Sequence, residues 1–466
     1  GQNNLYLPRV EAETDTDASH FETITGTIHG LPTYSSLLAL WGLLFGYANM
    51  IGVQTVLYLC LLFLVFFTAE NMELSRPMTG VVTALTAFSP IALWCSKSSL
   101  TEIGLSVLFA LFLYGITGER RRRWLAGAAL VVFGFFHISI YVFMPVFVSL
   151  LFYGYVREGG KGWLVSAVAT MAGFLVSAFW SFDIAPYYSY GNYSVLWKLT
   201  RNILHEGNIV PVIIVVCSLL SILACWLMSR RGSRLAGLVR DKAARSRYCE
   251  AAAAWAIRLV LAGSAVFFVY KGIVKAEYIR YCQYLQISTY LYMTGLLLIP
   301  FLYGFLLWKP QTVLRDRKLS LLTLLFFYCV IAYSMFMRLD VLFYYYYARY
   351  VTIFLPVVFL LAGKLLDGTG RKKAAGLCVC CLALASFLPY DLGLLTQKDH
   401  TRCEWEVLGD VCEDITAEDA FIVGPDEQQI VFIFPVKLLT GCDVYYADED
   451  LRGQIGGLAG RYRNVY

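Results

Sequence analysis

The chain has 466 residues, of which 58% are hydrophobic and only 15% are charged, whereas about a quarter of the residues of an ordinary soluble domain carry a charge. This composition excludes a soluble enzyme, and the length and apolar content exclude a disordered, collagen-like or small disulfide-stapled chain. The class of protein that remains is a membrane protein with many spans.

The first 49 residues form an acidic head in which Arg9 is the single basic residue. The segment Gly30-Leu-Pro32-Thr-Tyr34 follows, and then an apolar stretch from Leu37 to Phe45 that is expected to lie in the membrane interface. Since the sequence begins with Gly1 rather than Met, we expect a signal-anchor span to precede it.

Twelve apolar runs are predicted to span the membrane, which gives 13 spans in the full chain. Eight are long enough to cross about 30 Å of hydrocarbon: 50–69, 78–94, 138–155, 163–180, 209–228, 289–308, 319–337 and 374–389. Four are shorter, at 103–116, 125–136, 259–270 and 351–363. The predicted fold is therefore an all-α polytopic membrane protein.

The positions of Lys and Arg support this set of spans, because cytoplasmic connections carry the excess of basic residues. Basic clusters recur after every second span: Arg120 to Arg123, Arg157 with Lys161, Arg230 to Arg247, Arg315 to Lys318, and Arg371 to Lys373. Residues 125–155 as one helix would measure about 46 Å, so we predict a hairpin with His137 at its outer tip. In this arrangement no charged residue lies inside a span.

The tail differs in character and is predicted to be a small extracytoplasmic α/β segment. Strands are expected at 420–424 and 443–446, and helices at 428–439 and 451–462. The expected domains are 1–49 as an extracytoplasmic first loop with an interfacial helix, 50–390 as the transmembrane part, and 391–466 as the outer segment. The abrupt end of the tail suggests that this segment is truncated.

The acidic first loop is the first candidate site. Asp15 and Asp17 stand close together in it. Carboxylates at the membrane surface could accept a proton, bind a divalent metal ion or simply remain solvated, and the sequence does not demand a metal.

The second candidate site is the outer turn SPIALWCSKSSLTE, which contains Lys97 and ends at Glu102. Glu102 opens the next helix, where a carboxylate interacts favourably with the helix dipole. Capping of that helix is an alternative that needs no catalysis.

The third candidate site is the run Tyr344 to Tyr347 followed by Arg349. Arg349 sits where an outer loop enters a span, and a guanidinium there can grip a phosphate through two hydrogen bonds. Anchoring to lipid headgroups is the alternative for Arg349, and an aromatic belt at the interface is the alternative for the tyrosines.

The order of these features resembles the GT-C superfamily of polytopic glycosyltransferases, which contains protein O-mannosyltransferases and aminoarabinose transferases. The matching pieces are the acidic loop, the Pro-Tyr-led interfacial helix ending in Leu44-Phe45-Gly46, the turn SPIALWCSKSSLTE, the hairpin with His137, and the stretch ARYVTIFLP. The expected pair of adjacent acids appears as Asp15-Thr-Asp17, which leaves open which carboxylate matches the catalytic one. No Trp-Trp-Asp motif of the oligosaccharyltransferases is present.

The resemblance implies a GT-C-like fold and a multi-pass plasma-membrane enzyme with an extracytoplasmic active site. Such an enzyme takes a sugar from a polyprenyl-phosphate donor and passes it, with inversion, to a lipid, glycan or protein acceptor. The implied base is Asp17, with Asp15 as its rival, because an acceptor hydroxyl is a poor nucleophile until a carboxylate accepts its proton. Glu102 would help to hold the acceptor, the sugar or a divalent ion.

The implied substrate contacts come from the other two candidate sites. Arg349 first and Lys97 second would stabilise the charge that grows on the departing lipid phosphate. Tyr346 and Tyr347 would line the lipid groove, and His137 is expected on the same outer side.

Alternative functions remain open at this point. A transporter or flippase of lipid-linked saccharides is the main non-enzymatic one, although such proteins show repeated halves, broken helices and ionisable groups within the membrane. A polysaccharide polymerase or ligase is the nearest enzymatic one. The sequence has no phosphate-binding Gly-rich loop or paired CxxC motif, and no nucleic-acid partner is expected.

Overall fold

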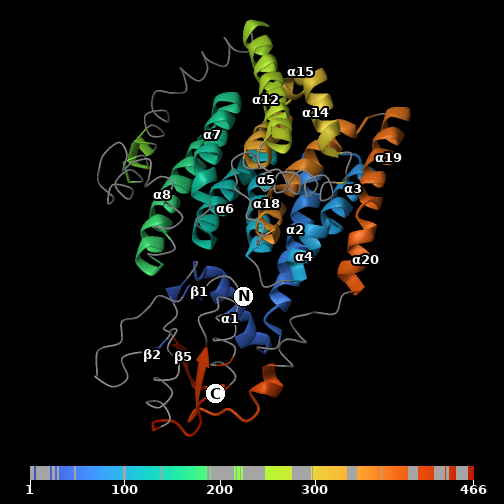
Figure 1. Cartoon of the computed structure of the whole chain (residues 1–466). Coiled ribbons are helices and arrows are strands. Elements are labelled where there is room, and N and C mark those ends of the chain that lie inside the picture. Colours follow the sequence, from blue (N-terminus) through green and yellow to red (C-terminus); the bar gives the residue numbers. More distant parts are fainter. Residues whose placement is uncertain are drawn as a thin grey trace. The chain divides into compact units, whose positions relative to one another are not determined.

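The structure, a computed structural model, is mostly helical. It describes residues 5–6, 21–23, 27–28, 31–46, 49–97, 101–137, 140–185, 189, 215–216, 218–220, 222–223, 247–274, 295, 298–332, 344–368, 370–396, 408–423, 436, 440–447 and 460–466. The chain forms two compact units (Figure 1): a helical unit, Leu31–Leu395, and a terminal unit, which combines Gly1–Gly30 with Thr396–Tyr466.

The helical unit contains the helices, whose bounds are α1 (Thr33–Phe45), α2 (Gly52–Asn71), α3 (Arg76–Ala87), α4 (Pro90–Lys97), α5 (Glu102–Thr117), η2 (Arg120–Arg122), α6 (Arg123–Phe136), α7 (Ile140–Glu158), α8 (Lys161–Ile184), α12 (Arg247–Val274), α14 (Leu298–Trp308), α15 (Pro310–Arg315), α16 (Arg317–Leu325), the π-helix η3 (Phe326–Ala332), α18 (Tyr344–Leu366), α19 (Arg371–Ala385) and α20 (Leu388–Thr396). The terminal unit contains the strands β1 (Leu5–Tyr6), β2 (Phe21–Thr23), β3 (Thr27–Ile28), β4 (Ala420–Val423) and β5 (Asp443–Ala447).

The terminal unit is built on a three-stranded sheet of order β2-β5-β4. The two strands predicted in the tail are confirmed as β4 and β5, which pair in parallel. The pairing of β2 with β5, antiparallel with Glu22 opposite Tyr446, was not predicted. It groups the start of the chain with the tail, so the structure divides the chain at other points than the expected 49 and 390.

The predicted helices of the tail are only partly covered by the structure. Residues 428–439 and 451–459 lie almost entirely outside the described residues. The expectation of helix up to Tyr462 is wrong at its end, since Gly460 to Tyr462 form a turn and a bend. That the tail lies outside the cell stays a prediction.

Each predicted span that the structure describes contains helix. Four helices in the described part are long and apolar enough to cross a membrane: Gly52–Asn71, Lys161–Ile184, Tyr248–Tyr270 and Arg371–Thr396. The predicted span at 78–94 is instead two helices, α3 and α4, bent by 53° at a short break. The hairpin is confirmed, because α6 ends directly before His137 and α7 starts at Ile140. The total of twelve spans stays a prediction.

Asp391 lies in α20, within the candidate span Arg371–Thr396. The exclusion of charged side chains from the spans stays a prediction.

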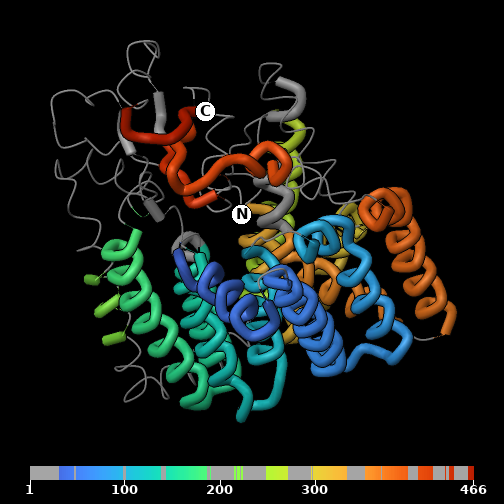
Figure 2. The backbone as a smooth tube through the Cα atoms, turned by 90° about the horizontal axis from the view of Figure 1, so that it is seen from below, coloured from blue at the N-terminus to red at the C-terminus, as the bar shows by residue number. Residues whose placement is uncertain are grey.

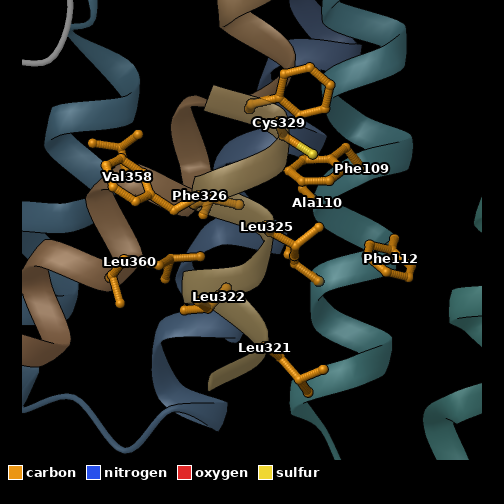
Figure 3. Packing of buried hydrophobic residues seen from close by; sticks show 14 of the residues in the cluster. Phe109, Ala110, Phe112, Leu321, Leu322, Leu325, Phe326, Cys329, Val358 and Leu360 are labelled. Carbon is orange, nitrogen blue, oxygen red and sulfur yellow. The ribbon is translucent and has the colours of Figure 1, made fainter. Parts of the chain in front are cut away.

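The centre of the helical unit is formed by α5 and α18, which are apolar on nearly every side and so become buried on nearly every side. Figure 3 shows side chains of α5, α16, η3 and α18 meeting in this core. Phe109 of α5 meets Phe354 of α18 edge to face, with ring centroids 5.1 Å apart, a geometry that aromatic pairs prefer.

Small residues let α6 and α8 approach closely. A Cβ on Gly173 of α8 would lie 2.6 Å from a methyl group of Val131 in α6, and a Cβ on Gly127 would lie 2.8 Å from the Cα of Ser166. Close contact through small residues is the usual way in which helices associate within a membrane.

Basic residues gather at one end of the helical unit, here called the basic end. Glu158 at the end of α7 forms ion pairs with Arg123 of α6 and, at 2.5 Å, with Arg317 of α16. Lys318 of α16 forms an ion pair with Glu73, which follows α2, at 3.1 Å. Arg157, from a third cluster, donates to the Leu314 carbonyl at the same end. Three of the predicted basic clusters thus meet there, which confirms that they lie on one side of the bundle.

Candidate functional site

The opposite end of the same helices, here called the polar end, holds the candidate site. Helices α2, α5 and α18 begin there, and α6 ends there. Along α5 the polar end is about 24 Å from the basic end, at 1.5 Å per residue. Figure 2 views the chain from this side, with α1 and the start of α2 in blue.

A buried polar cluster occupies the polar end. Its members are Tyr34 of α1, Gln54 of α2, Cys95 of α4, Glu102 of α5 and Thr352 of α18, all at most 2% exposed. The Gln54 side-chain amide donates to the Tyr34 hydroxyl at 2.5 Å. The Cys95 thiol and the Thr352 hydroxyl are 3.6 Å apart.

The Tyr34 phenol interacts electrostatically with other members of the polar cluster. Burial raises the pKa of the Tyr34 phenol well above its ordinary value, and the nearby charge of Glu102 raises it further. The phenol therefore stays protonated at neutral pH. It presents a hydroxyl hydrogen, next to a carboxylate, in a place from which water is largely excluded.

Helix α1 is fixed at the polar end by its first residues. The Thr33 hydroxyl donates to the Phe135 carbonyl at 2.6 Å, in the last turn of α6. This bond brings the start of α1 beside His137, the half-buried residue that follows α6. The far part of α1 is exposed, with Leu43 69% accessible, as expected for a helix in the membrane interface.

Lys97 is exposed and has a contact that was not predicted. Its ammonium group donates to the Leu394 carbonyl at 2.6 Å, in the last turn of α20, where carbonyls lack helical partners and cations are favoured. Lys97 thus ties α4 to α20. Its predicted phosphate contact stays a prediction.

Arg349, Tyr346 and Tyr347 lie in the first two turns of α18, which begins at Tyr344. Arg349 is one helical turn before Thr352, a member of the polar cluster. The backbone therefore places Arg349 at the polar end. The side chains of these three residues are outside the part that the structure describes.

Asp15 and Asp17 lie outside the described residues, between β1 and β2 in the sequence. They belong to the terminal unit. Their predicted role as base and rival base stays a prediction.

The polar end includes residues that sequence analysis missed. Gln54 is a lone amide within the apolar run of α2, and such a residue in a span is itself a signal of function or of buried pairing. Cys95 and Thr352 lay within the quoted segments, but nothing in their types distinguished them. Among the described residues, no group of three or more His, Cys, Asp or Glu is arranged to hold a metal ion.

The chain was compared with protein-family models, curated protein sequences and solved structures. No protein-family model and no curated protein sequence matches the chain. A structural similarity is found to the crystal structure of ArnT from Cupriavidus metallidurans bound to undecaprenyl phosphate, with 12% sequence identity and a TM-score of 0.33, over 95% of this chain and 81% of that one. At this TM-score the similarity does not establish a common fold.

Proposed function

We propose that this chain is a membrane glycosyltransferase that moves a sugar from a polyprenyl-phosphate donor to an acceptor on the extracytoplasmic face, with inversion. The proposal rests on the polar end of the helical unit. Three segments that carry the sequence resemblance, around Tyr34, between Cys95 and Glu102, and around Thr352, are far apart in the sequence and contribute to one buried polar cluster there.

The chemistry of the polar cluster suits a charged lipid substrate. Its groups are sheltered from water, where hydrogen bonds and charges act more strongly than in solution. In the proposal, Glu102 and the Tyr34 hydroxyl bind hydroxyl groups of the sugar or the acceptor. A guanidinium from Arg349 stabilises the lipid phosphate as the glycosidic bond breaks.

The remaining parts of the proposal come from the sequence. Asp17, or Asp15 in its place, accepts the proton of the acceptor hydroxyl. Lys97 and His137 contact the substrate at the same end, and Tyr346 and Tyr347 line the path of the lipid. A carrier lipid cannot leave the bilayer, so the reaction takes place at the membrane surface.

The test uses the full chain, purified in lipid nanodiscs, with a panel of polyprenyl-phosphate-linked monosaccharides. Release of free polyprenyl phosphate is measured by mass spectrometry, because this product forms whatever the acceptor is. Asp17→Asn is expected to reduce the rate by about 10²–10⁴-fold, the usual contribution of a general base. Arg349→Lys keeps the charge but loses the two-pronged grip, so it should retain more activity than Arg349→Ala.

Asp183→Asn is the matched control, because Asp183 is an exposed acid in the last turn of α8. It should release the product at the wild-type rate. The assigned site would be contradicted if four variants all released the product at the wild-type rate: Asp15→Asn, Asp17→Asn, Glu102→Gln and Arg349→Ala. No release from any donor would contradict the enzymatic function itself.

A flippase or transporter of lipid-linked saccharides is the second candidate, and two observations favour it. Asp391 is an ionisable residue within a candidate span, and α3 and α4 form a broken helix, both of which are typical of transporters. Exchange of a labelled polyprenyl-phosphate sugar across proteoliposome membranes, without its consumption, would support this function over transfer.

A further inference from the structure

A buried carboxylate, that of Asp391, lies in α20. The residue is 3% exposed, and neither carboxylate oxygen has a hydrogen-bond partner in the part of the chain that the structure describes. Burial of an ionised carboxylate in apolar surroundings costs several kcal/mol unless another group compensates its charge. A bound cation or a proton would therefore be needed to neutralise the carboxylate.

Residues around Asp391 connect α20 to neighbouring helices. It interacts electrostatically with Tyr58 of α2, and the Tyr58 hydroxyl donates to the Ala87 carbonyl at the end of α3. One turn after Asp391, the Leu394 carbonyl accepts the hydrogen bond from Lys97 at the end of α4. These contacts bring α20 near the break between α3 and α4.

The break itself supplies further oxygen atoms. Pro90 has no backbone N–H, so the Thr86 carbonyl loses its usual helical donor and accepts instead a long hydrogen bond, 3.5 Å, from the Ser89 N–H. Ser89, between the two helices, is fully buried, and its hydroxyl has no partner among the described residues. Carboxylate, hydroxyl and carbonyl oxygens are the ligands of hard cations.

We propose that Asp391 binds a monovalent cation, Na⁺, at the break between α3 and α4, with the Ser89 hydroxyl and the Thr86 carbonyl as further ligands. The charge balance selects a monovalent ion, because one carboxylate neutralises one positive charge, whereas a divalent ion would leave a net charge in a low-dielectric place. Lys97 does not supply this charge in the structure, since its ammonium group bonds the Leu394 carbonyl. Broken helices within membranes commonly bind such ions through carbonyls at half-helix ends.

The experiment measures binding of radioactive sodium to the purified full chain in detergent, with choline as the replacement ion. Wild-type protein is expected to bind one Na⁺ per chain with saturation. Asp391→Asn should bind at least about tenfold more weakly, a change of about 1.4 kcal/mol. Ser89→Ala retains the carboxylate and should weaken binding less. Asp183→Asn should bind as the wild type does.

Size-exclusion chromatography shows whether a variant is folded. If a variant is not folded, the measurement on the wild type still tests the proposal. Absence of saturable Na⁺ binding to the wild type would overturn the proposal and favour a protonated Asp391. Unchanged binding in a folded Asp391→Asn variant would also overturn it. Because sugar transfer is not the readout, failure of this inference and failure of the proposed function can be told apart.

Discussion

Glu158 is expected to be a main determinant of stability at the basic end. It ends α7 and faces two guanidinium groups, those of Arg123 and Arg317, and it accepts a hydrogen bond from the Trp163 indole at 3.4 Å. Arg123 also lies over the Trp163 ring, 4.2 Å from its centroid. Replacement by Gln keeps the size of the side chain and removes its charge. The two guanidinium groups then lose the carboxylate that both of them contact, and only Arg317 keeps another acid, Asp316, nearby.

The magnitude follows from the burial of these groups. The Arg123, Arg317 and Glu158 side chains are 4%, 15% and 21% exposed, and removing one partner of a buried ion pair costs about 3–5 kcal/mol. Burial lowers the pKa of both arginines and Glu158 opposes that shift, so the carboxylate offsets their desolvation. Partial exposure places the expected loss near the lower limit, at about 3 kcal/mol. This corresponds to a Tm lower by about 6 °C at about 2 °C per kcal/mol.

The assay is thermal unfolding of the purified chain in detergent, followed by circular dichroism. Glu119→Gln is the matched control, because Glu119 pairs with Arg121 at 2.7 Å while both side chains are mostly exposed. Such pairs contribute about 0–1 kcal/mol, so the control should melt close to the wild type. Equal melting of Glu158→Gln and Glu119→Gln would refute the reasoning from burial.

Three further predictions follow from local contacts. The Thr416 backbone N–H lowers the pKa of Asp419 in the folded chain, so Asp419→Asn should destabilise the terminal unit at neutral pH. The difference in stability between the variant and the wild type should vanish as the pH falls through that lowered pKa, and hydrogen exchange measures it. Gly173→Leu should lower the stability by about 1–3 kcal/mol, because its side chain would overlap Val131, and thermal unfolding measures this. Tyr34→Phe should cost about 1 kcal/mol in the same assay, the usual contribution of one hydrogen bond, because it removes the hydroxyl that accepts from the buried Gln54 amide. It should also slow polyprenyl phosphate release.

The positions of the helices could be predicted from the sequence because they depend on large, local energies. The run 50–69 corresponds to α2 and the run 163–180 to α8. Moving one Lys or Arg across the apolar layer costs several kcal/mol, so the side on which each basic cluster lies is strongly determined. The break at His137 followed from the same rule, because an uninterrupted helix would have placed two basic clusters on opposite sides.

Other features could not be predicted because they depend on contacts between distant parts of the chain. Alternation identified β5 as a strand, but nothing in residues 21–23 specifies that β2 pairs with it. The contact of Lys97 with the Leu394 carbonyl joins residues 297 positions apart. Asp391 follows an apolar run and was assigned to the tail, since sequence alone does not show where a span ends.

The two ends of the helical unit satisfy their polar groups in different ways, and this difference bears on function. At the basic end, carboxylates meet guanidinium and ammonium groups in ion pairs, which serve to join helix ends. At the polar end, Tyr34, Gln54, Cys95, Glu102 and Thr352 are buried together, with one carboxylate among neutral groups. A fold that needed only stability could place apolar side chains there, because buried polar groups cost free energy unless they are fully satisfied. Retention of polar groups at such positions is characteristic of binding and catalysis within membranes, which makes the polar end the first place to test by substitution.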